Sequence, residues 1–277
     1  MSGRIERRFA ALKAEGRGGL VTFFTGGDPD LPTFREILFG APAAGADVIE
    51  IGVPFTDPAA DGPSIQAAGQ RALARRIKVR DLLATVREFR ARDADTPVVL
   101  MGYYNPILRF GPEAFAKACA EAGVDGLITV DLPPEEEAEL RGPAAAAGVD
   151  IVRLVAPTTG DDRMSFALKD ASGFVYFVSI AGITGTRAAA IDTVEAAVAR
   201  IRRVKNLPIA VGFGIRTPGQ AAAVARVADA AVVGTALVEK VAENLDETGT
   251  PRPGTADAVL SLVSELAQGV RAARRPA

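Results

Sequence analysis

Short runs of β-branched and aliphatic residues alternate with longer, alanine-rich amphipathic segments along the whole chain. Runs of this length with β-branched enrichment predict strands, and the segments between them predict helices. Strands that alternate with helices form parallel sheets, and about eight such units close a barrel. The predicted strands are Leu20–Thr25, Val48–Gly52, Val98–Gly102, Gly126–Val130, Ile151–Val155, Phe174–Ser179, Pro208–Gly212 and Ala230–Gly234.

The segments between these strands carry helix patterns and helix start signals. Thr217 before Pro218 is typical of an N-cap followed by a first-turn proline. The fold class expected is therefore an α/β protein, a (β/α)8 TIM barrel with an extra N-terminal helix that plugs the bottom and an additional C-terminal helix. A single domain over 1–277 is expected. The predicted helices are Ile5–Glu15, Leu31–Ala44, Leu82–Arg92, Pro112–Ala122, Pro134–Ala147, Val194–Val204, Pro218–Val227 and Ala256–Ala273.

One predicted strand carries a carboxylate within an apolar run. Side chains alternate along a strand, so Val48, Glu50 and Gly52 share the face opposite to Ile49 and Ile51 and point inward. A buried carboxyl group has a raised pKa and suits general acid/base chemistry. The alternative interpretation is a structural ion pair with an arginine.

A second carboxylate, Asp61, follows in a loop stiffened by Pro54, Pro58 and Pro63. No predicted secondary structure requires it there, so a rigid loop can aim it at a ligand. The alternative interpretation makes Asp61 the N-cap of a helix that begins at Pro63.

Composition narrows the chemistry further. The net charge of −2 gives no basic field for nucleic acid. One cysteine permits no intrachain disulfide, and neither a leader nor a long apolar run is recognised, so a cytoplasmic location is expected. The chain has no histidine, which excludes Ser-His-Asp hydrolysis and most zinc sites. Its lysines fall in predicted helices or at helix ends, which argues against a Schiff base.

Glycines follow the seventh and eighth predicted strands, where barrels of this class commonly bind phosphate. Gly212-Phe-Gly214 ends the seventh strand, and Gly234-Thr235 ends the eighth at the start of a helix. Bare N–H groups and the helix dipole favour an anion there. The alternative interpretation is the glycine usual in any tight turn.

The stretch Glu50-Ile-Gly-Val-Pro-Phe-Thr-Asp-Pro-Ala-Ala-Asp-Gly-Pro63 resembles the signature of the tryptophan synthase alpha chain family. Ser179-Ile-Ala-Gly-Ile-Thr-Gly-Thr-Arg187 is similar to that family's mobile loop. The resemblance implies retro-aldol cleavage of indole-3-glycerol phosphate to indole and glyceraldehyde 3-phosphate, a carbon–carbon lyase reaction of tryptophan biosynthesis. It assigns the catalytic roles to Glu50 and Asp61.

The same resemblance implies a set of substrate contacts. Thr184 would meet Asp61 when a lid at Gly182–Arg187 closes, although an ordinary turn is the alternative. For Asp131, a structural and a functional role stay equally open. The residues implied for the lid and the phosphate site are Thr184, Gly185, Gly214, Gly234 and Thr235, and Thr235 replaces the more usual serine. The residues implied for the indole pocket are Phe23, Leu100, Tyr103 and Tyr176. In the alternative interpretation each of these four is a core residue.

No metal or organic cofactor is implied in this chain. Pyridoxal phosphate is expected only in a beta subunit, which would receive the indole in an alpha2-beta2 hetero-tetramer. The docking surface implied is the barrel top, including Pro54, Asp57, Pro58 and the Pro133-Pro134 loop, which are otherwise a simple scaffold. Neither membrane nor nucleic acid is expected as a partner.

Two rival hypotheses remain. Indole glycerol phosphate synthase and phosphoribosylanthranilate isomerase are phosphate-binding barrels that need different acid/base residues, and the segment around Glu50 argues against both. A barrel that binds phosphate metabolites and only regulates a partner is the non-enzymatic hypothesis. Indole release by the purified chain would distinguish an enzyme from this non-enzymatic barrel.

Overall fold

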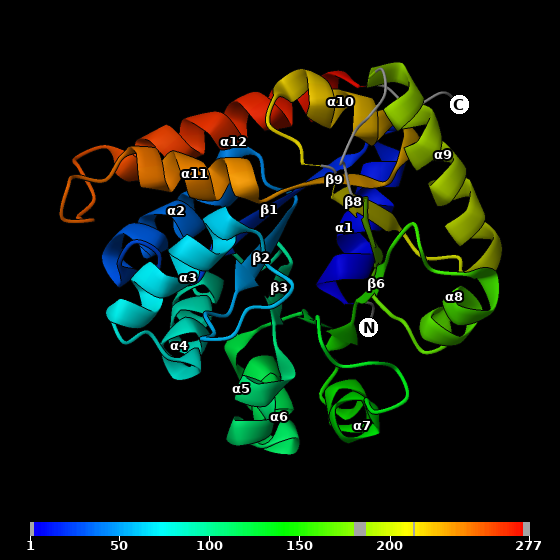
Figure 1. The fold of residues 1–277 in the computed structure, drawn as a ribbon, viewed down its shortest axis with the longest axis horizontal. Helices are drawn as coiled ribbons and strands as arrows, with labels where there is room; N and C mark the ends of the chain where they lie inside the picture. Colours follow the sequence, from blue (N-terminus) through cyan, green and yellow to red (C-terminus); the bar gives the residue numbers. More distant parts are fainter. Residues whose placement is uncertain (1–2, 180–186, 213, 274–277) are drawn as a thin grey trace.

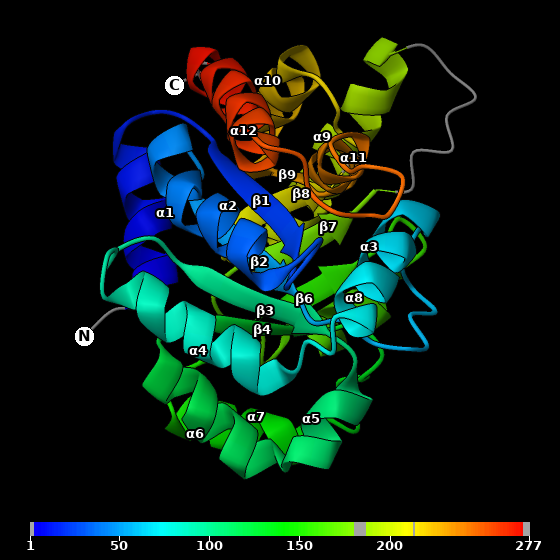
Figure 2. The ribbon, with the colours of Figure 1, turned by 90° about the vertical axis from the view of Figure 1, so that its left-hand side faces the viewer.

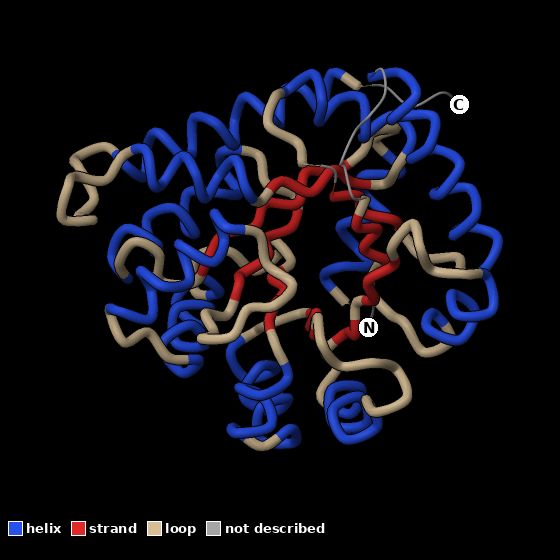
Figure 3. The backbone as a smooth tube through the Cα atoms, in the orientation of Figure 1, coloured by secondary structure: helices blue, strands red, loops and turns tan. Residues whose placement is uncertain are grey.

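The computed structural model describes residues 3–179, 187–212 and 214–273, without the side chains of residues 187–190. Within these ranges a single sheet of nine parallel strands forms an inner ring, and most helices lie outside it (Figures 1 and 3). The strands are β1 (Gly19–Thr25), β2 (Val48–Gly52), β3 (Val98–Gly102), β4 (Gly126–Thr129), β5 (Asp150–Ile151), β6 (Arg153–Val155), β7 (Val175–Val178), β8 (Ile209–Gly212) and β9 (Ala230–Val233).

The strand order around the ring is β5-β4-β3-β2-β1-β9-β8-β7-β6. β5 and β6 are the two ends of one predicted strand, interrupted at Val152. The lower part pairs with β4 and the upper part pairs with β7, so the chain itself connects the two edges of the sheet. The nine strands are therefore the eight strands of a TIM barrel, and the predicted fold class is confirmed.

In the described ranges, the helices include those predicted and four that received no predicted range. α2 (Leu31–Ala44), α6 (Pro112–Ala122) and α10 (Pro218–Val227) have the predicted bounds. Thr217 caps α10 by accepting from the Gln220 amide at 3.3 Å, as predicted. The remaining helices are α1 (Arg4–Ala14), α3 (Pro63–Ala74), α4 (Val79–Arg90), α5 (Tyr104–Phe110), α7 (Ala138–Ala146), α8 (Asp161–Leu168), α9 (Arg187–Val204), α11 (Thr235–Glu243) and α12 (Thr255–Ala272).

Two apolar layers hold the barrel together. The outer layer lies between the strands and the surrounding helices and includes Ile49 and Ile51. The inner layer fills the ring with alternate strand residues such as Val21, Val48 and Val99. This division follows from the two-residue period of a strand that is buried on both faces.

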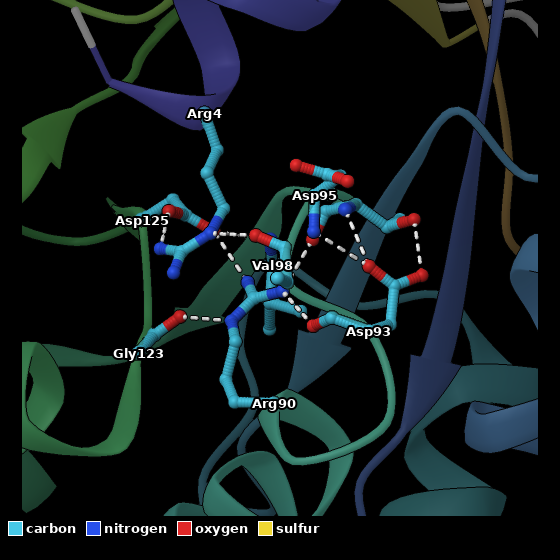
Figure 4. A network of polar contacts seen from close by, with 9 residues as sticks. Arg4, Arg90, Asp93, Asp95, Val98, Gly123 and Asp125 are labelled. Carbon is cyan, nitrogen blue, oxygen red and sulfur yellow. Dashed lines mark hydrogen bonds and ion pairs between the residues drawn. The ribbon is translucent and has the colours of Figure 1, made fainter.

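Helix α1 closes the amino-terminal end of the barrel, as predicted (Figures 1 and 2). Its buried residues Ile5, Phe9 and Leu12 extend the inner layer. An ionic network fixes it there, because the Asp125 carboxylate before β4 accepts from Arg4 of α1 at 2.9 Å and from Arg90 of α4 at 2.6 Å (Figure 4). The opposite, carboxyl-terminal end stays free for a site.

Candidate active site

Glu50 lies in the middle of β2 and points into the barrel. Its register neighbours are Phe23 on β1 and Val99 on β3, and Val48 on the same face belongs to the inner layer. The residue is 0% exposed, and among the described residues neither carboxyl oxygen has a hydrogen-bond partner. Burial raises the pKa of Glu50 from 4.5 to about 8. The side chain therefore carries a proton near neutral pH, and the alternative ion pair with an arginine gains no support.

Tyr176 on β7 lies close enough to Glu50 for the two to interact electrostatically. Burial raises the pKa of the Tyr176 hydroxyl well above its usual value, and the negative charge of Glu50 raises it further. Gly212 at the end of β8 makes room for the ring, since a Cβ atom there would lie 2.9 Å from the Tyr176 hydroxyl. Glu50 and Tyr176 thus share the barrel interior, and Gly212, which the sequence suggested for phosphate, here makes room for the Tyr176 ring.

Asp61 lies in the loop between β2 and α3. It does not cap α3, because Gly62 holds the N-cap position and no side chain caps there. That alternative interpretation was wrong. Burial raises the pKa of Asp61, and a hydrogen bond with the Tyr103 hydroxyl opposes the rise by stabilising the carboxylate.

Tyr103 organises the loop that carries Asp61. Its hydroxyl accepts from the Ala60 amide at 3.0 Å, and its ring stacks on Phe55 with the ring centres 5.3 Å apart. The side chain follows β3 directly and is buried. Tyr103 therefore both forms a wall of the site and holds the loop in place.

A pocket at the carboxyl ends of β1 to β4 brings three predicted residues together. Phe23, Asp61 and Tyr103 line it, with Met101 and Ile65. The Phe23 ring occupies space that a side chain at Gly52 would need, since a Cβ atom there would lie 2.5 Å from the ring. An aromatic wall facing a carboxylate suits a flat heteroaromatic ligand with an N–H group.

The predicted phosphate residues lie at the same end of the barrel. Gly234 is the N-cap of α11 and Thr235 is its first residue, with no side-chain cap. A Cβ atom at Gly234 would lie 3.3 Å from the Phe23 Cβ atom, so the start of α11 adjoins the pocket. Gly214 follows β8, is exposed and has a φ of 59°. Thr184 and Gly185 lie outside the described residues.

Leu100 does not line the pocket that holds Asp61, although it lines a smaller neighbouring cavity together with Tyr103. It belongs to the outer apolar layer, whereas the next residue, Met101, packs in the inner layer and lines the pocket. The structure therefore places Met101, not Leu100, at the site. Strict alternation along β3, starting from Val99, would have identified it.

Asp131 has a structural contact. Its carboxylate accepts from the Tyr104 amide at 2.7 Å, at the first residue of α5. Among the described residues, no three His, Cys, Asp or Glu side chains are grouped as metal ligands would be. No described helix is long and apolar enough to cross a membrane.

Comparison with known proteins decides the family. The model of the family described as "Tryptophan synthase alpha chain" matches residues 9–268. The chain belongs to the tryptophan synthase alpha chain family. The activity of this family is the cleavage of indole-3-glycerol phosphate in tryptophan biosynthesis, so the function expected from the sequence is confirmed.

Solved structures of the tryptophan synthase alpha chain family agree over the whole barrel. The alpha subunit from Legionella pneumophila str. Paris is 38% identical with a TM-score of 0.89, covering 98% of this chain and 99% of that one. A tryptophan synthase chain from M. tuberculosis, in an open form with BRD0059 bound, is 34% identical with a TM-score of 0.86 and covers 98% and 100%. The chain is similar in length and fold to both.

Proposed function

We propose that this chain is a carbon–carbon lyase that cleaves indole-3-glycerol phosphate with Glu50 and Asp61 as its catalytic residues. The observation that carries the assignment is a fully buried carboxyl group, next in register to Phe23, which lines a pocket that holds a second carboxylate. Two carboxyl groups in different environments divide acid/base and charge-stabilising roles between them.

Glu50 performs the proton transfers in this proposal. Its raised pKa means that the protonated form is present at neutral pH, so the side chain can donate a proton to the ring carbon that bears the glycerol chain. The bond between that carbon and the glycerol carbon then breaks, and its electron pair returns to the ring. The glycerol hydroxyl loses its proton to the Glu50 carboxylate and becomes the aldehyde of glyceraldehyde 3-phosphate.

Asp61 stabilises the charge that develops in the ring. Protonation of the ring carbon places positive charge at the indole nitrogen, and a nearby carboxylate lowers the energy of that state. The Tyr103 hydroxyl supports this role because its hydrogen bond favours the ionised form of Asp61. Phe23 and Met101 supply apolar walls for the ring.

The start of α11 and the turn at Gly214 bind the phosphate in this proposal. The first N–H groups of a helix have no partners within the helix and attract an anion. Phosphate binding there positions the substrate at a distance from the bond that breaks. The chemistry needs no metal or organic cofactor in this chain.

The partner proposed is a tryptophan synthase beta subunit, in an alpha2-beta2 hetero-tetramer, with pyridoxal phosphate in that subunit. The docking surface proposed is the carboxyl-terminal end of the barrel. Asp57 and Pro133 are exposed there, and Leu108 on α5 is 53% exposed although it is large and apolar. Exposed apolar side chains beside a site are typical of interaction surfaces.

The deciding experiment mixes the purified chain with indole-3-glycerol phosphate and measures indole, with and without a beta subunit. Indole release that requires Glu50 supports the proposal. A folded chain that binds phosphate ligands but releases no indole under either condition would leave only the regulatory, non-enzymatic hypothesis.

A further inference from the structure

Three segments of the carboxyl-terminal face meet in one polar network. Arg216 follows Gly214 in the turn after β8, and Glu239 lies on α11, four residues after Thr235. Ser64 lies in the first turn of α3, three residues after Asp61. The network therefore touches both sides of the proposed phosphate site and the segment that carries a catalytic carboxylate.

The contacts within the network converge on Glu239. The Ser64 hydroxyl donates to Glu239 Oε1 at 2.8 Å, and Arg216 Nη2 donates to the same oxygen at 3.0 Å. Arg216 Nη1 donates to the second oxygen, Oε2. A guanidinium that binds both oxygens of a carboxylate fixes its orientation as well as its charge. Arg216 and then Ser64 lower the pKa of Glu239, as expected for an ionised hub.

Two further hydrogen bonds run from Gln66 of α3 to Asp61 and to Gly62. The Gln66 amide side chain donates to the Asp61 carbonyl at 2.9 Å, and the Gln66 backbone N–H donates to the Gly62 carbonyl at 3.0 Å. Ser64 and Gln66 belong to the same helical turn, so a displacement of Ser64 would carry Asp61 with it. The contacts thus run without a break from the phosphate turn to the catalytic loop.

Arg216 also has an electrostatic task. Residues four apart on a helix share one face, so Glu239 and Thr235 lie on the same side of α11. An uncompensated carboxylate one turn from a bound phosphate would repel it. The paired guanidinium offsets the negative charge of Glu239 and adds a positive charge beside Gly214.

We propose that Ser64, Glu239 and Arg216 form a positioning network that holds the phosphate-binding turn and Asp61 at a fixed separation. The three are positioning residues, since none of them reacts with the substrate. The inference rests on the proposed function, because it concerns the same site.

The test measures kcat and KM for indole release by single variants. Ser64→Ala frees the Asp61 side of the network, so kcat should fall about fivefold while KM changes less than twofold. Arg216→Ala leaves Glu239 uncompensated beside the phosphate, so KM should rise about fivefold. Both substitutions act through Glu239. The fall in kcat/KM of the double variant should therefore be smaller than the product of the falls in kcat/KM of the two single variants.

Two control variants separate positioning from general stability. Ser64→Thr keeps the hydroxyl and should retain the parent kcat. Lys240→Ala removes an ion pair with Glu243 on the same helix, a pair that reaches no loop of the site, and should leave both constants unchanged.

A Ser64→Ala variant with the parent kcat, or one whose melting temperature falls while kcat does not, would overturn the network. So would fully independent effects in the double variant. Failure of the proposed function gives a different result, because the parent chain itself would then release no indole. The proposed network would be refuted together with the function.

Discussion

At the scale of single residues, Glu50 has the sharpest expected phenotype. Glu50→Gln keeps the shape of the side chain and removes the group that transfers protons. We expect indole release to fall by at least about 10²-fold, the usual contribution of a general acid/base group. Steady-state indole assays measure it, with glycerol phosphate binding as the control for an intact site. Turnover within tenfold of the parent would contradict the assignment.

The burial of Glu50 also predicts how stability depends on pH. Its pKa rises from 4.5 in the unfolded chain to about 8 in the folded protein, so the folded state binds this proton more tightly. The stability from this proton is fully present below pH 4.5 and is lost as the pH rises through 8. The Glu50→Gln variant has no titrating proton at this position, so its stability does not fall in this way as the pH rises.

Urea unfolding from pH 5 to pH 9 tests this expectation. The free energy of unfolding of Glu50→Gln, relative to the parent, should increase with pH by on the order of a few kcal/mol and level off above pH 8. A difference that is constant across this range would show that Glu50 is not held protonated.

Asp61 should behave as a charge-stabilising group. Asp61→Asn keeps the volume and removes the negative charge that offsets the developing cation. We expect kcat to fall by about 10²-fold with a much smaller change in substrate affinity. If affinity collapses and turnover at saturation persists, Asp61 is a binding residue instead.

Residue-level prediction succeeded where one local rule decides the outcome. The inward direction of Glu50 follows from alternation alone, and the structure confirms it. Leu100 shows what happens when that rule is not applied: the bounds of β3 were predicted correctly, but the site residue was taken from the family resemblance, one position away from the inward face. The contact between Gly212 and Tyr176 joins two neighbouring strands across the barrel interior, and no local pattern records it.

At the scale of elements, the Asp125 network should be a major source of stability. Asp125→Ala would leave the Arg90 guanidinium, which is largely buried, without its counter-ion and would release Arg4 of α1. We expect the free energy of unfolding to fall by about 3 kcal/mol. Urea denaturation measures this, and Glu88→Ala at the exposed pair with Arg35 serves as the control, with a loss below about 1 kcal/mol.

The bounds of α2, α6 and α10 were predicted correctly, whereas α4, α7 and α9 begin at other residues than predicted and the short α5 received no prediction. α5 has only seven residues, one of which is Pro106. A helix of this length is too short for a helical period to appear in the sequence. Its first amide is satisfied by Asp131 from the next βα unit, a tertiary contact. The interruption of one strand at Val152 likewise depends on which neighbours each part meets.

At the scale of the whole molecule, we expect the isolated chain to be a weak catalyst that a beta subunit activates. The family resemblance implies that Thr184 reaches Asp61, and the segment Gly182–Arg187 around it has little apolar content to stabilise a closed form. A partner docked at the Pro54–Pro58 loop could bias the equilibrium, at a cost of several kcal/mol of differential binding.

Thr184→Val tests that coupling. The variant should still form the complex but lose most of the activation, measured as the ratio of indole release with and without the beta subunit. Equal activation of variant and parent would refute this route, and full activity of the isolated parent would show that no activation is needed.

The change of partners between β5 and β6 affects how rigid the barrel is at this point. The ring closes through two short pairings, β4 with β5 and β6 with β7, so few backbone hydrogen bonds hold it together there. The backbone amides of β5 and β6 should therefore exchange with deuterium sooner than those of β1 and β2, whose pairing runs over five residues. Val130 of the pocket wall follows β4, the partner of β5, so we expect this wall of the site to be less rigid than the wall formed by Phe23 on β1.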